Sequence, residues 1–212
     1  HDALPISTEI MPVKHTIAEF TDKMAEEAAT RFGFENSTSN WKSIVENPDI
    51  DLVDIATPNN SHAEIAIAAL AAGKNVICEK PLARTVEEAA AMYAAARESK
   101  AVNMVAFNYR RTPAVALAKK YIDEGAIGKI TNFRATYLQD WSADPNSPLS
   151  WRFQKSVAGS GAVGDILTHV LDMARYLAGE VTEVSAITNH IITERPLQQS
   201  GSDSLGNSKG GA

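Results

Sequence analysis

The sequence predicts an α/β fold: part of a Rossmann-type parallel sheet, followed by part of an α+β domain with an open, mainly antiparallel sheet. Up to residue 108, short apolar runs alternate with helical patterns, which is the order of a parallel sheet with right-handed crossovers. Beyond residue 111, the later apolar segments alternate with polar residues, as half-buried antiparallel strands do. We therefore expect two domains, residues 1–111 and 112–212.

The expected first domain alternates strands with helices. Predicted strands cover residues 12–20, 50–58, 75–79 and 102–108, and the compact run at 50–58 indicates a buried parallel strand. Predicted helices cover residues 21–33, 40–48, 61–73 and 85–100. Gly33 lies where a helix C-cap is expected, and Thr85 with Glu88 three residues later matches a capping box.

The expected second domain begins with a helix and then changes pattern. Predicted helices cover residues 112–128 and 164–179, and predicted strands cover residues 129–141 and 182–193. Residues 142–162 are rich in glycine and aromatic residues, which favours a functional loop over a linker. The Gly/Ser-rich tail at 198–212 is expected to be mobile.

The composition excludes several classes of protein. A net charge of −6 without a basic cluster argues against a nucleic-acid surface. The longest apolar stretch, which starts at Ile65, is too short to span a bilayer, so we expect no membrane partner. The single cysteine, Cys78, permits no internal disulfide and suits a reducing, cytoplasmic location. The chain has no initiating Met and no secretory signal pattern, and we expect it to be a fragment.

Three predicted strands end in polar residues, at Thr57–His62, Cys78–Pro81 and Phe107–Arg111. In an open parallel sheet such ends lie along one edge, where ligands bind. Lys and Glu are rarely buried unless they are paired or in use, so adjacent Glu79 and Lys80 after a strand suggest a site. The structural alternative is that the asparagines of the first end are turn residues and its serine a helix N-cap.

The helix predicted at 164–179 places Asp165, His169 and Asp172 on one face. A carboxylate beside an imidazole is a common way to orient a general base. The alternative is a capped helix start with a solvated polar stripe. A metal site of these three residues is possible, but no other cluster has ligand spacing, so no metal is expected.

These segments together resemble the glucose-fructose oxidoreductase/inositol dehydrogenase/rhizopine catabolism (Gfo/Idh/MocA) family of NAD(P)-dependent dehydrogenases. The motifs that carry the resemblance are "DLVDIATPNNSHAEIAIAALAAGKNVICEKPLA", "FNYRR", "GAIGKI", "WRF" and "AGSGAVGDILTHVLDMARYLAGE". The match runs from about Glu19 to Pro196 and looks most similar to the inositol dehydrogenase-like branch. The resemblance implies oxidation of a secondary hydroxyl of a sugar, inositol or related polyol, with NAD or NADP as cofactor.

The resemblance also implies roles for individual residues. Lys80, Asp165 and His169 match the catalytic positions, with His169 as the proton acceptor and Lys80 holding the reacting oxygen. Residues that match cofactor-contacting positions are Thr57, Pro58, Asn59, Asn60, His62 and Glu79. Asn108, Trp151 and Arg152 match positions that contact the nicotinamide or the substrate. A cis peptide between Lys80 and Pro81 is expected from the same motif.

The resemblance is incomplete, because the family's first strand and its Gly-x-Gly-x-x-Gly turn have no counterpart here. We therefore expect truncation at both ends, and a homo-oligomer, dimer or tetramer, for the full-length protein. An acid near the first strand, Glu19 or Asp22, is a candidate partner of a ribose 2′-hydroxyl. Two alternative functions are an NAD-dependent glycosidase of the same fold and a non-catalytic nucleotide or sugar sensor.

Overall fold

The computed structural model describes residues 12–197, so the tail that we expected to be mobile lies outside the described residues. The chain forms two compact units. The first unit contains the chain up to Ile55, with Ala63–Cys78 and Ala90–Met104; the second contains Ala56–His62, Glu79–Ala89 and the chain from Val105 onward. Each unit is described by itself.

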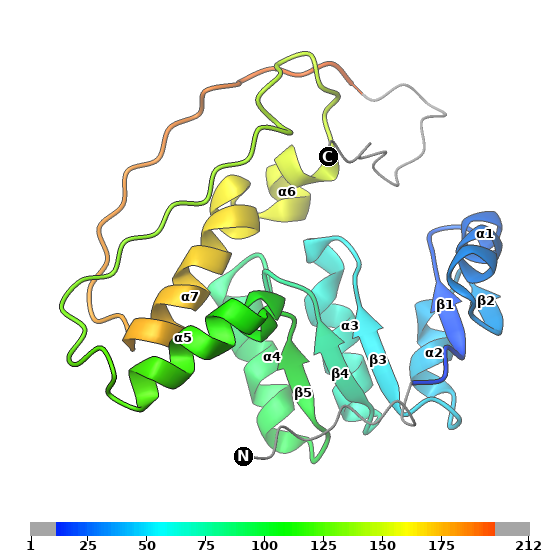
Figure 1. The fold of residues 1–212 in the computed structure, drawn as a ribbon. Helices are drawn as coiled ribbons and strands as arrows, with labels where there is room; N and C mark the ends of the chain where they lie inside the picture. Colours follow the sequence, from blue (N-terminus) through cyan, green and yellow to red (C-terminus); the bar gives the residue numbers. More distant parts are fainter. Residues whose placement is uncertain (1–11, 198–212) are drawn as a thin grey trace. The chain divides into compact units, whose positions relative to one another are not determined.

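The strands of the first unit form two small sheets. β1 (Thr16–Ala18) pairs in parallel with β2 (Asn36–Thr38), a polar strand that the sequence pattern did not predict. β3 (Leu52–Ile55), β4 (Asn75–Cys78) and β5 (Asn103–Val105) lie side by side in that order (Figure 1). β3 and β4 are parallel, and Val76 N–H donates to Val102 O at 2.9 Å. The predicted parallel sheet is therefore confirmed.

Four helices connect these strands: α1 (Asp22–Phe32), α2 (Trp41–Glu46), α3 (His62–Ala71) and α4 (Val86–Glu98). The predicted C-cap of α1 is confirmed, because Gly33 has φ 73° and donates its N–H to Ala29 O. The capping box at α4 forms only in part. Thr85 Oγ1 accepts from Glu88 N–H at 3.2 Å, but the Glu88 carboxylate bonds to Arg84.

The apolar core of the first unit lies between β3, β4, α3 and α4. Its buried residues are Val53, Ile55, Ile65, Ala66, Ala69, Leu70, Val76, Cys78 and Met92. The expectation of a fully buried β3 is wrong, because its side chains alternate and Leu52 is 40% exposed. The sheet buries one face of this strand and leaves the other open, so its residues follow the period of two of a half-buried strand.

The second unit is mainly helical. Its helices α5 (Pro113–Asp123) and α7 (Thr168–Ala178) pack against each other (Figure 1). Short turns precede α7: the 3-10 turn η3 (Trp151–Phe153), the helix α6 (Lys155–Ala158) and the π-helical turn η4 (Val163–Leu167). The expected loop at 142–162 therefore contains helical turns. No helix within residues 12–197 has both the length and the apolar run needed to cross a membrane.

The two strands predicted at 129–141 and 182–193 are not formed in the described part of the chain. Both segments are extended, but neither takes part in a ladder of backbone hydrogen bonds. They are joined near their ends, where Leu149 N–H donates to Pro196 O at 2.8 Å and the Arg195 guanidinium donates to Ser142 O. Alternation alone does not make a strand, because the backbone groups also need a neighbouring strand.

Candidate active site

The candidate site residues all lie in the second unit. The three polar segments that directly follow β3, β4 and β5 in the chain belong to this unit, together with α6 and α7. The unit contains all the predicted site residues: Thr57, Pro58, Asn59, Asn60, His62, Glu79, Lys80, Asn108, Trp151, Arg152, Asp165 and His169. Two of them, Lys80 and Asp165, are 85 positions apart in the sequence and are in direct contact.

Lys80 and Asp165 form the central contact of this group. Lys80 Nζ donates to both the carboxylate Oδ1 and the backbone O of Asp165, each at 2.8 Å. The two side chains are only 16% and 26% exposed. An ammonium group has three N–H donors, so two bonds to Asp165 leave one N–H for a ligand. The lysine is thus fixed in direction while keeping a free donor.

The turn η4 explains why Asp165 faces Lys80. In an unbroken α-helix Asp165 would be aligned with His169, one turn later. Here Asp165 lies in a π-helical turn, which is wider than an α-turn and changes the direction of its side chain. Such turns occur frequently at functional sites. The carboxylate that we expected to orient the imidazole is instead held by Lys80.

The ring of His169 lies in an aromatic setting. The Tyr109 ring stacks on it with centroids 4.2 Å apart and an interplanar angle of 17°, and the Phe107 ring meets it edge-on at 6.3 Å. The residue is 7% exposed. Among the described residues, Nδ1 of His169 is buried and has no hydrogen-bond partner. A buried polar atom without a partner is costly, and in native structures such an atom is one of the features found at catalytic groups.

Burial lowers the pKa of His169 below its ordinary value, and the Lys80 ammonium lowers it further. The carboxylates of Asp165, Glu79 and Asp172 oppose this shift but do not reverse it. The imidazole is therefore neutral at pH 7, which is the form that accepts a proton.

Asp172 belongs to a separate ion pair. Its side chain is 4% exposed and accepts a bidentate hydrogen bond from the Arg110 guanidinium. Arg110 Nε donates to Oδ2 at 2.8 Å, and Nη2 donates to Oδ1. Arg110 also lies over the Tyr176 ring at 4.9 Å. Asp172 therefore joins the 3-10 turn at 108–111 to α7 and is unavailable as an orienting group. Within residues 12–197 no group of three His, Cys, Asp or Glu side chains is placed to bind a metal ion.

The loop after β3 is tied to the rest of the unit by two buried side chains. His62 is fully buried, with Nε2 at 2.8 Å from Thr57 O and Nδ1 at 3.0 Å from Pro81 O. Asn59 is 6% exposed and donates to Ala158 O at 3.0 Å. Both ring nitrogens of His62 are within reach of backbone carbonyls, so this residue supports the loop and has no nitrogen left for a cofactor.

The other predicted residues vary in exposure. Asn60 and Asn108 are exposed, and Glu79 is half-buried with Oε2 accepting from the Lys80 N–H at 3.1 Å. The Arg152 guanidinium lies 4.5 Å over the Trp151 ring, and its Nε is 3.9 Å from Asp165 Oδ2. A second cation therefore lies at the edge of the Lys80–Asp165 pair.

The glycines before α7 allow the chain to pass close to the Glu-Lys-Pro segment. A Cβ at Gly159 would lie 3.1 to 3.2 Å from backbone and Cβ atoms of Arg84, and one at Gly164 would lie 2.7 Å from Ser160 Oγ. Arg84 also donates to Ser156 O at 2.6 Å. The expected cis peptide between Lys80 and Pro81 is present.

This close approach makes Gly159 sensitive to substitution. We expect Gly159→Ala to destabilise the full-length gene product by about 1–3 kcal/mol, because alanine is strained at φ 87° and its Cβ meets the Arg84 backbone. The measurement is the midpoint of thermal unfolding. Gly161→Ala is the matched control, since Gly161 also has a positive φ but open space around it. Equal midpoints for the two variants would contradict the predicted contact.

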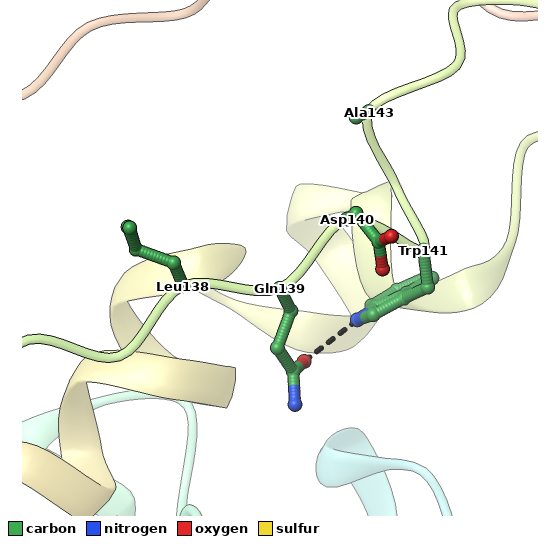
Figure 2. Close-up of a pocket in the computed structure, with 5 residues that line it drawn as sticks. All are labelled: Leu138, Gln139, Asp140, Trp141 and Ala143. Carbon is green, nitrogen blue, oxygen red and sulfur yellow. Dashed lines mark hydrogen bonds between the residues drawn. The ribbon is translucent and has the colours of Figure 1, made fainter. Parts of the chain in front are cut away.

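Sequence reasoning missed a line of side chains that begins at Tyr109. Tyr109 and Tyr137 hydroxyls are 2.6 Å apart, Gln139 Nε2 donates to Tyr137 Oη at 2.8 Å, and Trp141 Nε1 donates to Gln139 Oε1 at 2.7 Å. Figure 2 shows the last of these bonds at the wall of an open hollow of about 550 Å³. The hollow is lined by Leu138, Gln139, Asp140, Trp141 and Ala143, and none of the candidate catalytic residues lines it.

Two family models match the chain in succession. Residues 13–107 match the model described as "Oxidoreductase family, NAD-binding Rossmann fold". Residues 115–206 match the "GFO/IDH/MocA C-terminal domain". The two matches follow the order in which the sequence motifs occur, and they confirm the predicted family.

Characterised relatives give the same result. The chain is 69% identical over 201 residues to levoglucosan dehydrogenase of Pseudarthrobacter phenanthrenivorans, covering 95% of this chain and 52% of that protein. It is 35% identical over 162 residues to scyllo-inositol 2-dehydrogenase (NAD(+)) of Bacillus subtilis, covering 76% and 45%. A solved structure of levoglucosan dehydrogenase with NADH and levoglucosan matches with 71% identity and a TM-score of 0.87, covering 88% and 50%. The chain thus spans about half the length of these relatives.

Proposed function

Because this chain belongs to the GFO/IDH/MocA family of oxidoreductases, we propose that its full-length protein oxidises a secondary hydroxyl of a sugar or polyol with NAD as acceptor. The observation that carries the proposal is the group of Lys80, Asp165 and His169, in which a fixed ammonium lies near a buried, neutral imidazole. Levoglucosan is the first probe sugar, because the relative with 69% identity is named for it.

In this proposal His169 accepts the proton of the reacting hydroxyl. The lowered pKa keeps the imidazole unprotonated at neutral pH. The stacked ring of Tyr109 keeps the imidazole plane fixed during the transfer.

Lys80 holds the same oxygen. As the proton leaves, negative charge develops on that oxygen, and the third N–H of Lys80 donates to it. Asp165 holds Nζ by two bonds, so the ammonium needs no reorganisation when the charge appears. The chemistry that NAD supplies when bound is acceptance of the hydride from the carbon that bears this oxygen.

The residues present fit the ribose and nicotinamide end of a dinucleotide. Glu79 uses one carboxylate oxygen for the Lys80 N–H, which leaves the other to accept from a ribose hydroxyl. Asn60 and Asn108 offer exposed amides. Contacts to the cofactor or substrate are also proposed for Thr57, Pro58, Trp151 and Arg152. Asn59 and His62 act by holding the loop in place.

Several features of the whole protein belong to the same proposal. Glu19 directly follows β1 and is the better placed acid for a ribose 2′-hydroxyl, since Asp22 forms part of the first turn of α1. This arrangement favours NAD over NADP. The division into domains at residues 111 and 112, the homo-oligomer and the cytoplasmic location are proposed on the basis of the family resemblance.

The test uses the full-length gene product with levoglucosan, then scyllo-inositol, in the presence of NAD or NADP. With NAD we expect NADH to form in equal amount to the sugar oxidised. With NADP we expect NADPH to form more slowly or not at all. A protein that cleaves a glycosidic bond without net NADH formation would be a glycosidase of the same fold. A protein that binds the sugars and NAD but converts neither would be a sensor, and either result would overturn the proposal.

A further inference from the structure

An ion pair joins the 3-10 turn η2 (Asn108–Arg111) to α7, and the proposed chemistry does not use it directly. Arg110 Nε donates to Asp172 Oδ2 at 2.8 Å, and Arg110 Nη2 donates to Asp172 Oδ1. The Arg110 guanidinium also lies 4.9 Å from the ring centroid of Tyr176, another residue of α7. A two-bond contact between a planar guanidinium and a carboxylate fixes the relative orientation of the two elements that carry them.

The two partners of this pair are close neighbours of two stacked rings. Arg110 directly follows Tyr109 in η2, and the turn is closed by Thr112 N–H, which donates to Tyr109 O at 3.2 Å. Asp172 comes three residues after His169 and lies on the same face of α7. The rings of Tyr109 and His169 are 4.2 Å apart at an angle of 17°. The ion pair therefore holds together the same two elements that bring these rings into contact.

The groups that face His169 come from several elements. Those that act on it by charge are Lys80, Asp165, Glu79 and Asp172. Those that act on it by ring contact are Tyr109, Phe107 and Tyr137. Burial is the largest influence on the pKa of His169 and lowers it, whereas the charge of Asp172 is the smallest of the named influences and raises it. The cover over the imidazole therefore outweighs the direct charge effect of Asp172.

We propose that Arg110 and Asp172 are positioning residues of the active site, whose ion pair keeps the Tyr109 ring stacked on the His169 imidazole. The inference rests on the proposed function, in which His169 accepts the proton of the sugar hydroxyl. The stacked ring fixes the plane of the imidazole and covers one of its faces from water. The Asp172 carboxylate thus acts on the base through a held aromatic ring, without a bond to the imidazole.

The first measurement observes the stacked rings without relying on catalysis. A proton above the face of an aromatic ring resonates upfield, so in the histidine-labelled full-length gene product the imidazole C–H protons of His169 should resonate upfield of those of the exposed His190. The loss of this signal in His169→Asn identifies it. The double variant Arg110→Met/Asp172→Asn leaves neither charge unpaired, so it should fold, and we expect the signal to move downfield to the position of an exposed imidazole.

The second measurement, the pH profile of kcat/KM, separates positioning from a direct charge effect. Loss of the stack exposes the imidazole, so the acidic limb should move up toward about 6.5 in Arg110→Met, in Asp172→Asn and in the double variant. Charge alone would move the limb in opposite directions in the two single variants, because one keeps an unpaired anion and the other an unpaired cation. Above the limb we expect kcat to fall about 10- to 100-fold and KM to change less than about threefold, since the base is misplaced while the sugar contacts remain.

Arg175→Met is the matched control, because Arg175 also lies on α7 and forms an ion pair, with Glu180 at 2.9 Å, and it should change neither the signal nor the limb. A His169 signal that stays upfield in the double variant would show that the pair does not hold the rings together. Opposite movements of the limb in the two single variants, or a wild-type limb and kcat in the double variant, would also overturn the inference. A wild-type protein that oxidises no sugar or polyol overturns the proposed function, and the signal of the double variant then decides alone whether the pair holds the stack.

Discussion

In the full-length protein, Lys80→Ala is expected to lower kcat for the probe sugar by about 100- to 1,000-fold, the usual effect of removing one donor from a developing oxyanion. Two bonds to Asp165 hold Lys80 Nζ rigidly, and its side chain is only 16% exposed. Water that replaces the lysine would have to reorient as negative charge develops. We therefore expect the loss to fall mainly on kcat and to leave KM within about threefold.

Three measurements identify the origin of this loss. NADH affinity should be unchanged, because the proposed lysine contact is to the reacting oxygen. Added methylammonium should restore part of the rate, since it supplies a cation to the vacated space. Lys120→Met is the control, because Lys120 is 58% exposed and pairs with Glu124 at 3.7 Å. If Lys80→Ala retains the wild-type kcat, Lys80 does not take part in the chemical step.

The parallel sheet and the polar segments that follow its strands were predictable from the sequence. Apolar runs followed by polar residues identified β3, β4 and β5, and the residues after them do gather with α7 in one unit. The partners within the site were not predictable. Helical periodicity paired Asp165 with His169, but the π-helical turn directs Asp165 to Lys80. A π-helical turn adds one residue to a turn of the helix, and this addition leaves no clear signal in a single sequence.

The segment 129–141 shows why a pattern can be real and still be misinterpreted. Its alternation predicted an antiparallel strand, and the structure has no strand there. The same alternation places Tyr137, Gln139 and Trp141 on one side of an extended chain, where they bond to each other. Alternation of apolar and polar residues indicates an extended backbone whose two faces have different surroundings. Whether that backbone joins a sheet depends on a neighbouring strand, which the pattern does not contain.

His169→Asn is expected to lower kcat by about 100- to 10,000-fold, the range for loss of a general base. The sequence left the direction of the His169 pKa open, because Asp165 and Lys80 act in opposite directions. In the structure, burial is the largest influence and lowers the pKa, and the Lys80 ammonium adds to it against Asp165, Glu79 and Asp172. The acidic limb of kcat/KM should therefore lie below about 6.5, the value of a free imidazole.

The same shift predicts how stability depends on pH. Since the folded-state pKa is the lower one, the unfolded chain binds the proton more readily, and stability is fully present above about 6.5. It falls as the pH drops below that value toward the folded-state pKa. His169→Asn should abolish this part of the loss, and His190→Asn should not, because His190 is exposed.

The decisive measurement is the pH profile of kcat/KM for the wild-type protein, His169→Asn and His190→Asn. A general base at His169 requires the acidic limb to persist in His190→Asn and to disappear in His169→Asn. It also requires the limb to move upward in Lys80→Ala, because that variant removes the cation that helps to lower the pKa. If His169→Asn retains the wild-type limb, another group accepts the proton, and His169 serves only as the packing partner of Tyr109 and Phe107.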